Sequence, residues 1–420
     1  MTTVSRITPA AIGPVLGQER IDAIDILRGV AILGILIVNM GLFSHGETPP
    51  ARGIVDRLIF FFAQEKFKAL FSFLFGVGLA VQMLRAEARG ARFLPRYARR
   101  LGVLFLIGVA HSLLVWDGDI LHDYAQLGVV LLLFRRRSLR TLLVWAGVLI
   151  AIPMVFYSLT TYRALTGGGH VNPQVQKWIA YETEESDQQT TDDADDAARI
   201  YARGTYGEML AFRARELPRD LLPDSDDAFI VAMFLLGLYA GRRRIFHDIP
   251  AHRALLRRVQ RWGLLIGVAG NAAFAVGGAF EPAPDSVMQN GGRLCLVFGA
   301  AALTLFYASS IALLTQSDRW RRRLTPLAAV GRTALSNYLL QSLICTMIFY
   351  SYGLALFGRV GSSVGLLLTI GIFLVQVPLS VWWLGRFRFG PIEWAWRSLT
   401  YWQRQPMRLT APATGAPLGT

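Results

Sequence analysis

Apolar residues occur along this chain in long blocks separated by short polar stretches. A helix needs about 20 consecutive apolar residues to cross the 30 Å hydrocarbon core of a bilayer. Ten blocks come close to this length, although the sixth is short. The blocks are Ile26–Phe43, Phe67–Leu84, Leu101–Trp116, Ile120–Phe134, Thr141–Leu159, Ala228–Ala240, Trp262–Phe280, Leu294–Leu314, Ala334–Tyr352 and Val364–Leu384. The pattern predicts an all-α polytopic integral membrane protein with about ten transmembrane helices in one bundle.

The arginines between the blocks predict how the helices are oriented. Six arginines lie in 85–100, four in 135–140, seven in 242–261 and five in 319–332, whereas the alternate short connections hold two or fewer. Basic connections stay in the cytoplasm by the positive-inside rule. The alternation therefore predicts an even number of spans in a bacterial inner membrane, with both termini cytoplasmic.

The blocks and connections divide the chain into five segments. We expect a cytoplasmic N-terminal segment, five transmembrane helices, an acidic extracytoplasmic loop, five more helices, and a basic and aromatic cytoplasmic end with a disordered tail. Their respective ranges are 1–25, 26–160, 161–225, 226–384 and 385–420. The loop carries eight acids between Glu182 and Asp196. Such clusters usually mark a solvated surface, so no chemistry is assigned to it.

Composition agrees with a membrane protein and excludes other classes. Hydrophobic residues make up 53% of the 420 residues, charged residues only 17%, and the mean hydropathy is +0.39. The net charge of +14 comes from arginines between apolar blocks, with no zinc-finger pattern, so nucleic-acid binding is excluded. Cys295 and Cys345 lie inside apolar blocks without metal-type spacing, so no metal is predicted. The charged residues before Ile26 argue against a cleavable signal peptide.

Polar side chains inside the predicted spans are the candidates for function, because such groups are costly in a bilayer and normally face a bundle interior or cavity. In the first span, Arg28 and Asn39 are eleven residues apart, which places them about 20° apart around an ideal helix and about 16 Å apart along it. This polar stripe ends near His45. The residues predicted to line a substrate site are Asp25, Arg28, Glu65, Lys68, Asp119, His122, Asp123, Asn337 and Gln341.

Each polar cluster also has a purely structural interpretation. Asn337 and Gln341, one turn apart, suit interhelical hydrogen bonding as well as a site. Asp25 and Arg28, at the cytoplasmic edge, are better explained as a structural ion pair. The group around His122 holds three ionisable residues, more than packing requires, whereas His111 alone is ambiguous. Gly76 and Gly78 lack the strand of a nucleotide-binding loop and indicate close helix packing instead.

Several stretches of this sequence resemble the YeiB-like bacterial inner-membrane proteins. The matching stretches run from Arg20 to Met40 (with Asp25-x-x-Arg28-Gly29 at its centre), from Lys66 to Gly76, from Gly118 to Ala125, from Gly331 to Ser342 and from Phe389 to Tyr401. They occur in consistent order and cover nearly the whole chain, so the resemblance is specific.

The Asp-x-x-Arg-Gly start is also similar to that of a wider superfamily of transmembrane acyltransferases. That superfamily includes the lysosomal enzyme that acetylates heparan glucosamine. In that enzyme an Asn late in the first span and a His shortly after it form the reaction centre. Asn39 matches the Asn by position, and His45 matches the His at a shorter spacing. In the sugar O-acyltransferase branch a His is expected close to Asn39, and this chain departs from that pattern.

The resemblance implies an acyl group moving from cytoplasmic acyl-CoA to an acceptor at the outer face, with Asn39 and His45 as catalytic residues. A neutral His there could act as a general base, and cytoplasmic arginines suit the phosphates of coenzyme A. The expected partners are the lipid bilayer and a small-molecule, glycan or lipid acceptor; a homo-oligomer is left open. The alternatives are a small-molecule transporter or permease, in which the same polar groups form a substrate path, and a non-catalytic membrane protein.

Overall fold

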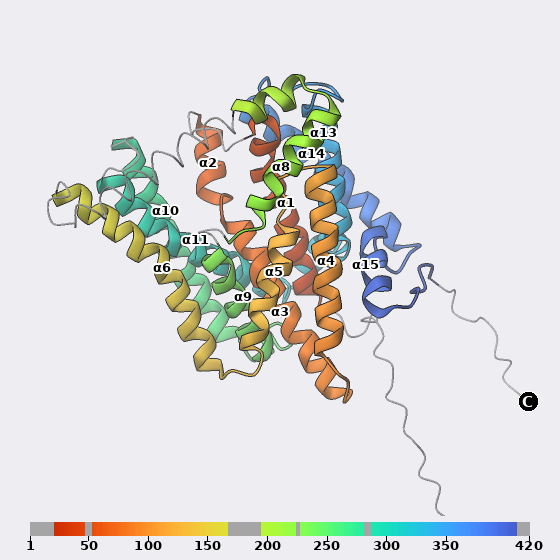
Figure 1. The fold of residues 1–420 in the computed structure, drawn as a ribbon. Coiled ribbons are helices and arrows are strands. Elements are labelled where there is room, and N and C mark those ends of the chain that lie inside the picture. The colour runs from red at the N-terminus through yellow and green to blue at the C-terminus, as the bar shows by residue number, and fades with distance from the viewer. Residues whose placement is uncertain (1–20, 47–52, 167–194, 224–226, 281–286, 410–420) are drawn as a thin grey trace, which may run out of the picture.

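The computed structural model describes residues 21–46, 53–166, 195–223, 227–280 and 287–409, and in this part of the chain almost every element is helical (Figure 1). The helices are α1 (Asp22–His45), α2 (Ile54–Phe62), α3 (Lys66–Ala88), α4 (Leu94–Leu114), α5 (Leu121–Leu131), α6 (Leu139–Thr166), α8 (Tyr206–Asp220), α9 (Asp227–Arg242), α10 (Arg253–Phe280), α11 (Val287–Leu314), α12 (Asp318–Arg332), α13 (Ala334–Phe349), α14 (Ser362–Leu384) and α15 (Pro391–Tyr401). The predicted all-α class is therefore confirmed.

Among the residues that the structure describes, five helical stretches are long and apolar enough to cross a membrane by length and composition. They are Asp22–His45, Ile54–Ala88, Leu94–Leu114, Gly291–Leu314 and Ser362–Leu384. Three shorter apolar helices accompany them, at Leu121–Phe134, Leu139–Ile152 and Ala334–Phe349. All of these overlap blocks predicted from the sequence.

The central helices cross closely because glycines stand where their backbones meet. An added Cβ at Gly76 of α3 would lie 2.0 Å from the Phe234 carbonyl oxygen of α9, and one at Gly237 would lie 1.9 Å from the Phe73 oxygen. Glycine at both positions is thus required by reciprocal close approach, as small residues are at many membrane helix crossings. The prediction of close helix packing is confirmed for Gly76, whereas an added Cβ at Gly78 would meet only the Arg28 guanidinium, at 3.7 Å.

Two connections between the predicted spans contain helices. The arginine-rich stretch before Ala334 forms α12, which begins after Ser317 and packs on α1. Ile54–Phe62 forms α2. Both helices are amphipathic. They were not predicted because amphipathic helices form no continuous apolar block.

A helical cap covers one end of the bundle. Residues 195–203 are helical and α8 follows them, both lying over the top of the bundle in Figure 1. The Tyr206 hydroxyl donates to the Leu114 carbonyl at the end of α4 (2.8 Å), and Ser351 N–H donates to the Tyr201 carbonyl (3.0 Å). Most of the predicted acidic cluster, 182–194, lies outside the described residues.

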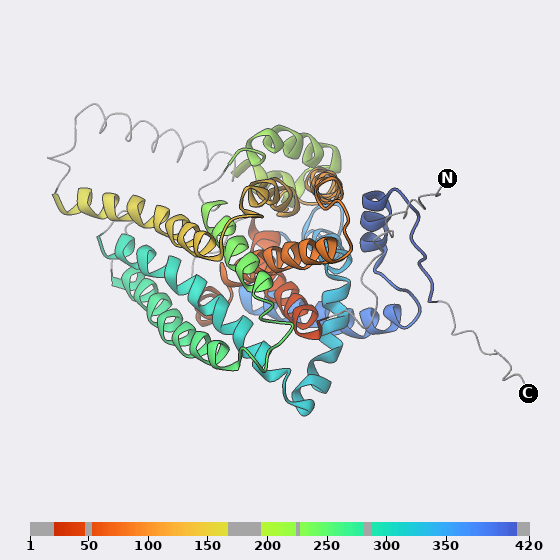
Figure 2. The same cartoon turned by 90° about the horizontal axis from the view of Figure 1, so that it is seen from below.

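The opposite end of the bundle is rich in arginine and is called here the basic end. It comprises the α3–α4 connection, the end of α12, and α15, which packs on α4. On another side, α6, α10 and α11 form an arm that extends away from the centre (Figure 2). The bundle therefore has two chemically different ends joined by α1, α3 and α4.

Candidate functional site

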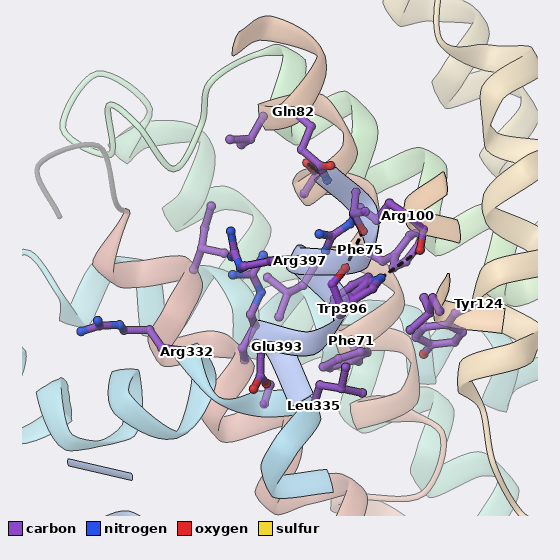
Figure 3. Close-up of a pocket in the computed structure, with 18 of the residues that line it drawn as sticks. Phe71, Phe75, Gln82, Arg100, Tyr124, Arg332, Leu335, Glu393, Trp396 and Arg397 are labelled. Atoms are coloured by element: carbon purple, nitrogen blue, oxygen red, sulfur yellow. Dashed lines mark hydrogen bonds between the residues drawn. The ribbon is translucent and has the colours of Figure 1, made fainter. Parts of the chain in front are cut away.

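A cavity of about 310 Å³ opens into the bundle from the basic end. Its walls come from α1, α3, α4, α5, the α12–α13 junction and α15, and it reaches the surface near the exposed Arg92. These elements lie far apart in the sequence, so only the folded bundle brings their side chains together (Figure 3).

The outer part of the cavity is strongly cationic. Seven arginines line it, against two acids, Asp25 and Glu393. The arginines are Arg28, Arg85, Arg92, Arg96, Arg100, Arg332 and Arg397. Two of the buried guanidinium nitrogens in this wall, Arg96 Nη1 and Arg332 Nε, have no hydrogen-bond partner within the described residues. Guanidinium groups with unused donors favour phosphate or carboxylate ligands.

Helix α15 forms one wall of the cavity and is tied to α4. The Trp396 indole N–H donates to the Arg100 carbonyl (2.9 Å), and the Arg100 guanidinium lies 3.7 Å from the centre of the Trp396 ring. Beside them, Glu393 accepts from Ser336 N–H (3.0 Å), and burial raises the pKa of its carboxyl. Figure 3 shows Glu393, Trp396 and Arg397 together along this wall.

The inner part of the cavity is apolar and aromatic. Ile32 and Ile35 of α1, Phe71 and Phe75 of α3, and Leu104 of α4 line it. A ligand that fits both parts would have an anionic head and a less polar tail. An acyl-CoA has this distribution of charge.

One face of α1 runs along the cavity and continues toward Asn39. Asp25, Arg28, Ile32 and Ile35 all line the cavity, and Asn39 follows Ile35 by one helical turn on the same face. The predicted ion pair is present, with Arg28 Nη1 3.0 Å from Asp25 Oδ1. Asn39 itself is half-buried and lies beyond the lining residues.

His45 is the last residue of α1 and lies on a different face from Asn39. Six residues of ideal helix separate the two side chains by about 120°. The His45 ring Nδ1 lies 2.7 Å from Ser44 Oγ, and no hydrogen bond joins His45 to Asn39 in the described part of the chain. The structure therefore places both residues at the capped end of α1 without bringing them into contact.

Asp119, His122 and Asp123, predicted to form one cluster at the start of α5, fall into two separate pairs. Asp119 precedes α5 and pairs with His111 of α4, its Oδ1 lying 2.9 Å from His111 Nδ1. His122 instead lies beside Asp123, with Nδ1 3.0 Å from Asp123 Oδ1. Tyr338 of α13 donates to Asp119 Oδ1 (3.2 Å).

Asn337 and Gln341 of α13 face α14. Asn337 Nδ2 donates to Ser380 Oγ (3.0 Å), and Gln341 Nε2 donates to Gln376 Oε1 (2.8 Å). Gln376 Nε2 in turn donates to the Asn337 carbonyl (3.1 Å). Neither Asn337 nor Gln341 lines the cavity. Both side chains therefore join α13 to α14 by hydrogen bonds.

Glu65 and Lys68 form the i,i+3 pair that their spacing predicts. Lys68 Nζ lies 2.9 Å from Glu65 Oε2 at the start of α3. The Lys68 carbonyl also accepts from the Tyr124 hydroxyl (2.9 Å), so this pair borders α5. It lies outside the cavity lining, unlike Tyr124 itself.

Sequence reasoning missed most of the cavity wall. The sequence indicates that the cytoplasmic arginines orient the helices and suit the phosphates of coenzyme A, but it does not single out Arg96, Arg100 or Arg332 as one wall, and it leaves His111 ambiguous. The cationic wall has one signal in the sequence, the spacing of Arg96 and Arg100 by one turn at the start of the third predicted span. Among the described residues, no group of three or more His, Cys, Asp or Glu side chains could hold a metal ion.

Two family profiles match this chain. Residues 20–183 match "Heparan-alpha-glucosaminide N-acetyltransferase, catalytic", and residues 240–403 match "Protein of unknown function (DUF418)". The first match includes α1, α3, α4 and α5, which supply most of the cavity, and the second includes α15.

Individual relatives align over nearly their full lengths. The uncharacterized protein YxaH of Bacillus subtilis is 37% identical, over 95% of this chain and 98% of its own. The uncharacterized protein YeiB of Escherichia coli is 32% identical, over 91% of this chain and 97% of its own. An uncharacterized 39.9 kDa protein of Bacillus acidopullulyticus is 28% identical, over 95% and 99% of the two chains.

Proposed function

Because the chain belongs to the YeiB and YxaH family, whose members are multi-pass membrane proteins related to transmembrane acyltransferases, we propose that it is a membrane-embedded acyltransferase. It takes an acyl group from acyl-CoA at the basic end of the bundle. It passes that group to an acceptor hydroxyl or amine at the capped end.

The observation that carries this proposal is the cavity that changes from cationic to apolar along its length. Coenzyme A has phosphates at one end and a thioester-linked acyl group at the other. The arginine wall suits the phosphates, and the apolar part formed by Ile32, Phe71 and Phe75 suits the acyl end. Heparan-α-glucosaminide N-acetyltransferases use acetyl-CoA, so acetyl-CoA is the first donor to test.

The proposal includes ten spans with the basic end in the cytoplasm. Alternating arginine clusters support this orientation, since Arg85–Arg100 and Arg332 fall at one end of the bundle. The donor cavity then opens to the compartment that contains acyl-CoA. A reporter fused after Arg140 should be cytoplasmic, and one at Asp193 should be extracytoplasmic. Finding Asp193 in the cytoplasm would contradict the proposed direction of transfer.

Asn39 and His45 stay predicted members of the reaction centre. Asn39 supports the prediction by continuing the cavity face of α1. Replacing His45 by Ala should leave acyl-CoA binding intact, and its effect on transfer decides whether this histidine takes part.

Ligand-induced stabilisation tests the donor site directly. A ligand that binds only the native state raises stability by about 2.7 kcal/mol at 100 times its Kd. Purified protein in detergent should therefore melt at a higher temperature with acetyl-CoA or a longer acyl-CoA. The absence of a shift up to millimolar concentration would favour a transporter or a non-catalytic protein.

Matched arginine variants locate the ligand. Arg96→Gln and Arg332→Gln each remove a charge from the cavity wall, and each should weaken acyl-CoA binding about tenfold or more, as expected for charged hydrogen bonds. Arg261→Gln, at an exposed position of α10, is the control and should bind normally. Equal binding by all three variants would place the ligand elsewhere.

A further inference from the structure

The pair His111–Asp119 has the arrangement of a general base and the group that orients it. Asp119 Oδ1 lies 2.9 Å from His111 Nδ1, so the carboxylate holds the proton on Nδ1 and leaves Nε2 as the basic nitrogen. Asp119 Oδ2 accepts from Leu121 N–H (3.0 Å), and Oδ1 also accepts from Tyr338. Three donors thus fix the carboxylate.

His111 Nε2 is buried and unused. The histidine is only 5% exposed, and Nε2 has no hydrogen-bond partner in the described part of the chain. A buried polar atom left unpaired costs about 1–3 kcal/mol. A histidine that served only to join α4 to the α4–α5 turn would need Nδ1 alone, and Nε2 is left available to an acceptor hydroxyl or amine.

The fold places the pair directly behind the wall of the donor cavity. Ile120, Leu121 and Tyr338 line the cavity. Asp119 accepts hydrogen bonds from the Leu121 backbone N–H and the Tyr338 hydroxyl. The ring centres of His111 and Tyr338 are 5.5 Å apart. The pair therefore lies next to residues that line the proposed acyl-CoA site.

The same turn reaches the outer end of α1. Trp116 packs against Phe43 with ring centres 4.1 Å apart, and Phe43 is one helical turn beyond Asn39. The pair therefore lies between the donor cavity and the region proposed for the acceptor.

We propose that His111, oriented by Asp119, is the proton-transferring catalytic residue of the acyl transfer. This inference rests on the proposed function. The acceptor heteroatom bonds to the thioester carbonyl carbon while Nε2 takes its proton. The C–S bond then breaks with its electron pair going to sulfur, and His111 returns the proton to the CoA thiolate. Asp119 and Tyr338 are positioning residues.

The test uses substitutions that distinguish a general base from a histidine that only joins two segments by a hydrogen bond. In His111→Asn the side-chain amide can still donate to Asp119, as Nδ1 does, but no basic nitrogen remains. If His111 only joined two segments by its hydrogen bond to Asp119, this variant would keep its activity. If His111 is the general base, the variant should lose about 100-fold or more of its transfer rate, while acetyl-CoA still stabilises the purified protein.

The assay follows radiolabelled acetyl groups from acetyl-CoA into the lipid and glycan fractions of inverted membrane vesicles that contain the protein. His247→Asn, at an exposed position between α9 and α10, is the control and should transfer at the wild-type rate. Tyr338→Phe removes one of three hydrogen bonds to Asp119, so a smaller loss is expected.

The outcomes are distinguishable. Wild-type protein that neither binds acetyl-CoA nor transfers label would contradict the proposed function itself. Transfer by wild type together with full activity in His111→Asn would overturn the assignment of His111 alone. Loss of transfer in His45→Ala with full activity in His111→Asn would assign the base to His45.

Discussion

Two polar regions inside the bundle, one between α13 and α14 and the other between α4 and α5, differ in how completely their hydrogen-bonding groups are paired. Between α13 and α14, the polar side chains of Asn337, Ser380 and Gln376 hydrogen-bond to one another or to backbone, and within the described part of the chain only Gln341 Oε1 of this group lacks a partner. Between α4 and α5, His111 Nε2 and His122 Nε2 lack hydrogen-bond partners within the described residues, while His122 Nδ1 lies 3.0 Å from Asp123 Oδ1.

This difference distinguishes polar residues that join helices from polar residues that serve function. A satisfied network joins helices and needs nothing further. Unsatisfied buried nitrogens beside a cavity are costly, and they persist where a ligand or a transferred proton uses them. Arg96, Tyr97 and Arg332, which line the cavity, also hold unpaired atoms. Among the described residues, these atoms and His111 Nε2 lie along the route proposed for the acyl group and its proton, whereas those of Arg213 and Asn271 lie away from the cavity lining.

Disturbing the α4–α5 region should have the largest effect. A Cβ at Gly108 of α4 would lie 2.5 Å from the His122 backbone nitrogen and 2.9 Å from Asp119 Oδ2. Gly108→Ala should therefore displace Asp119, lower stability by about 1–3 kcal/mol and reduce transfer strongly. Melting temperature in detergent and the vesicle assay measure the two effects.

Gly102→Ala is the matched control in the same helix, because its added Cβ meets nothing within 4 Å. It should be neutral or slightly stabilising, since alanine is the better helix former by about 1 kcal/mol. Equal behaviour of the two variants would contradict the close approach of α5 to Gly108.

Breaking the α13–α14 network should cost stability without affecting chemistry. Gln376→Leu removes the partner of the Gln341 amide and leaves a buried donor unsatisfied, at a cost of about 1–3 kcal/mol. Transfer per folded molecule should be unchanged. A large loss of transfer at normal stability would show that this region takes part in the reaction.

A smaller loss is expected from Ser380→Ala in the same network. The Asn337 amide would keep its bond to Thr333 Oγ1 (2.9 Å) and lose only the one to Ser380. Interhelical hydrogen bonds of this kind contribute about 0.6 kcal/mol on average in membrane proteins. A fall in melting temperature as large as that of Gln376→Leu would contradict this ranking.

The helices could be predicted from the sequence, but the pairing of their polar groups could not. Apolar blocks indicate where a span lies, and Arg28, Ile32 and Asn39 share a face by helical period alone. The His111–Asp119 pair depends on a turn at Trp116–Ile120, where Trp116 packs against Phe43 of α1. Periodicity carries no information across such a turn, so Asp119 was grouped with His122 instead.

The cationic wall was hidden for a related reason. Arginines at membrane edges serve orientation in most proteins, and that role accounts for them without any cavity. Only the folded bundle brings Arg96 of α4, Arg332 of α12 and Arg397 of α15 to one wall. Which arginines line a cavity is decided by contacts between helices that are far apart in the sequence.

The smallest predicted effect concerns the side of the α4–α5 region that faces the cap. Burial, and next the nearby Asp117, raise the pKa of the Asp220 carboxyl at the end of α8 to about 6, while His122 lowers it. Glu216 and Asp123 act in the same direction as Asp117. In the unfolded chain an aspartate titrates near 4. Ionisation is therefore harder in the folded protein, and stability falls as pH rises from about 4 to about 6.

Asp220→Asn removes this ionisation, so the variant should gain stability over wild type as pH rises through that window. Asp220 is partly exposed, so solvent screening should keep the gain below about 1 kcal/mol. Melting temperatures of both proteins in detergent at pH 4.5 and pH 7.5 measure it, and the difference should be larger at pH 7.5. A difference that did not change with pH would mean that Asp220 is solvated as in the unfolded chain. The outer side of the α4–α5 region would then be wetter than its unpaired histidine nitrogens indicate.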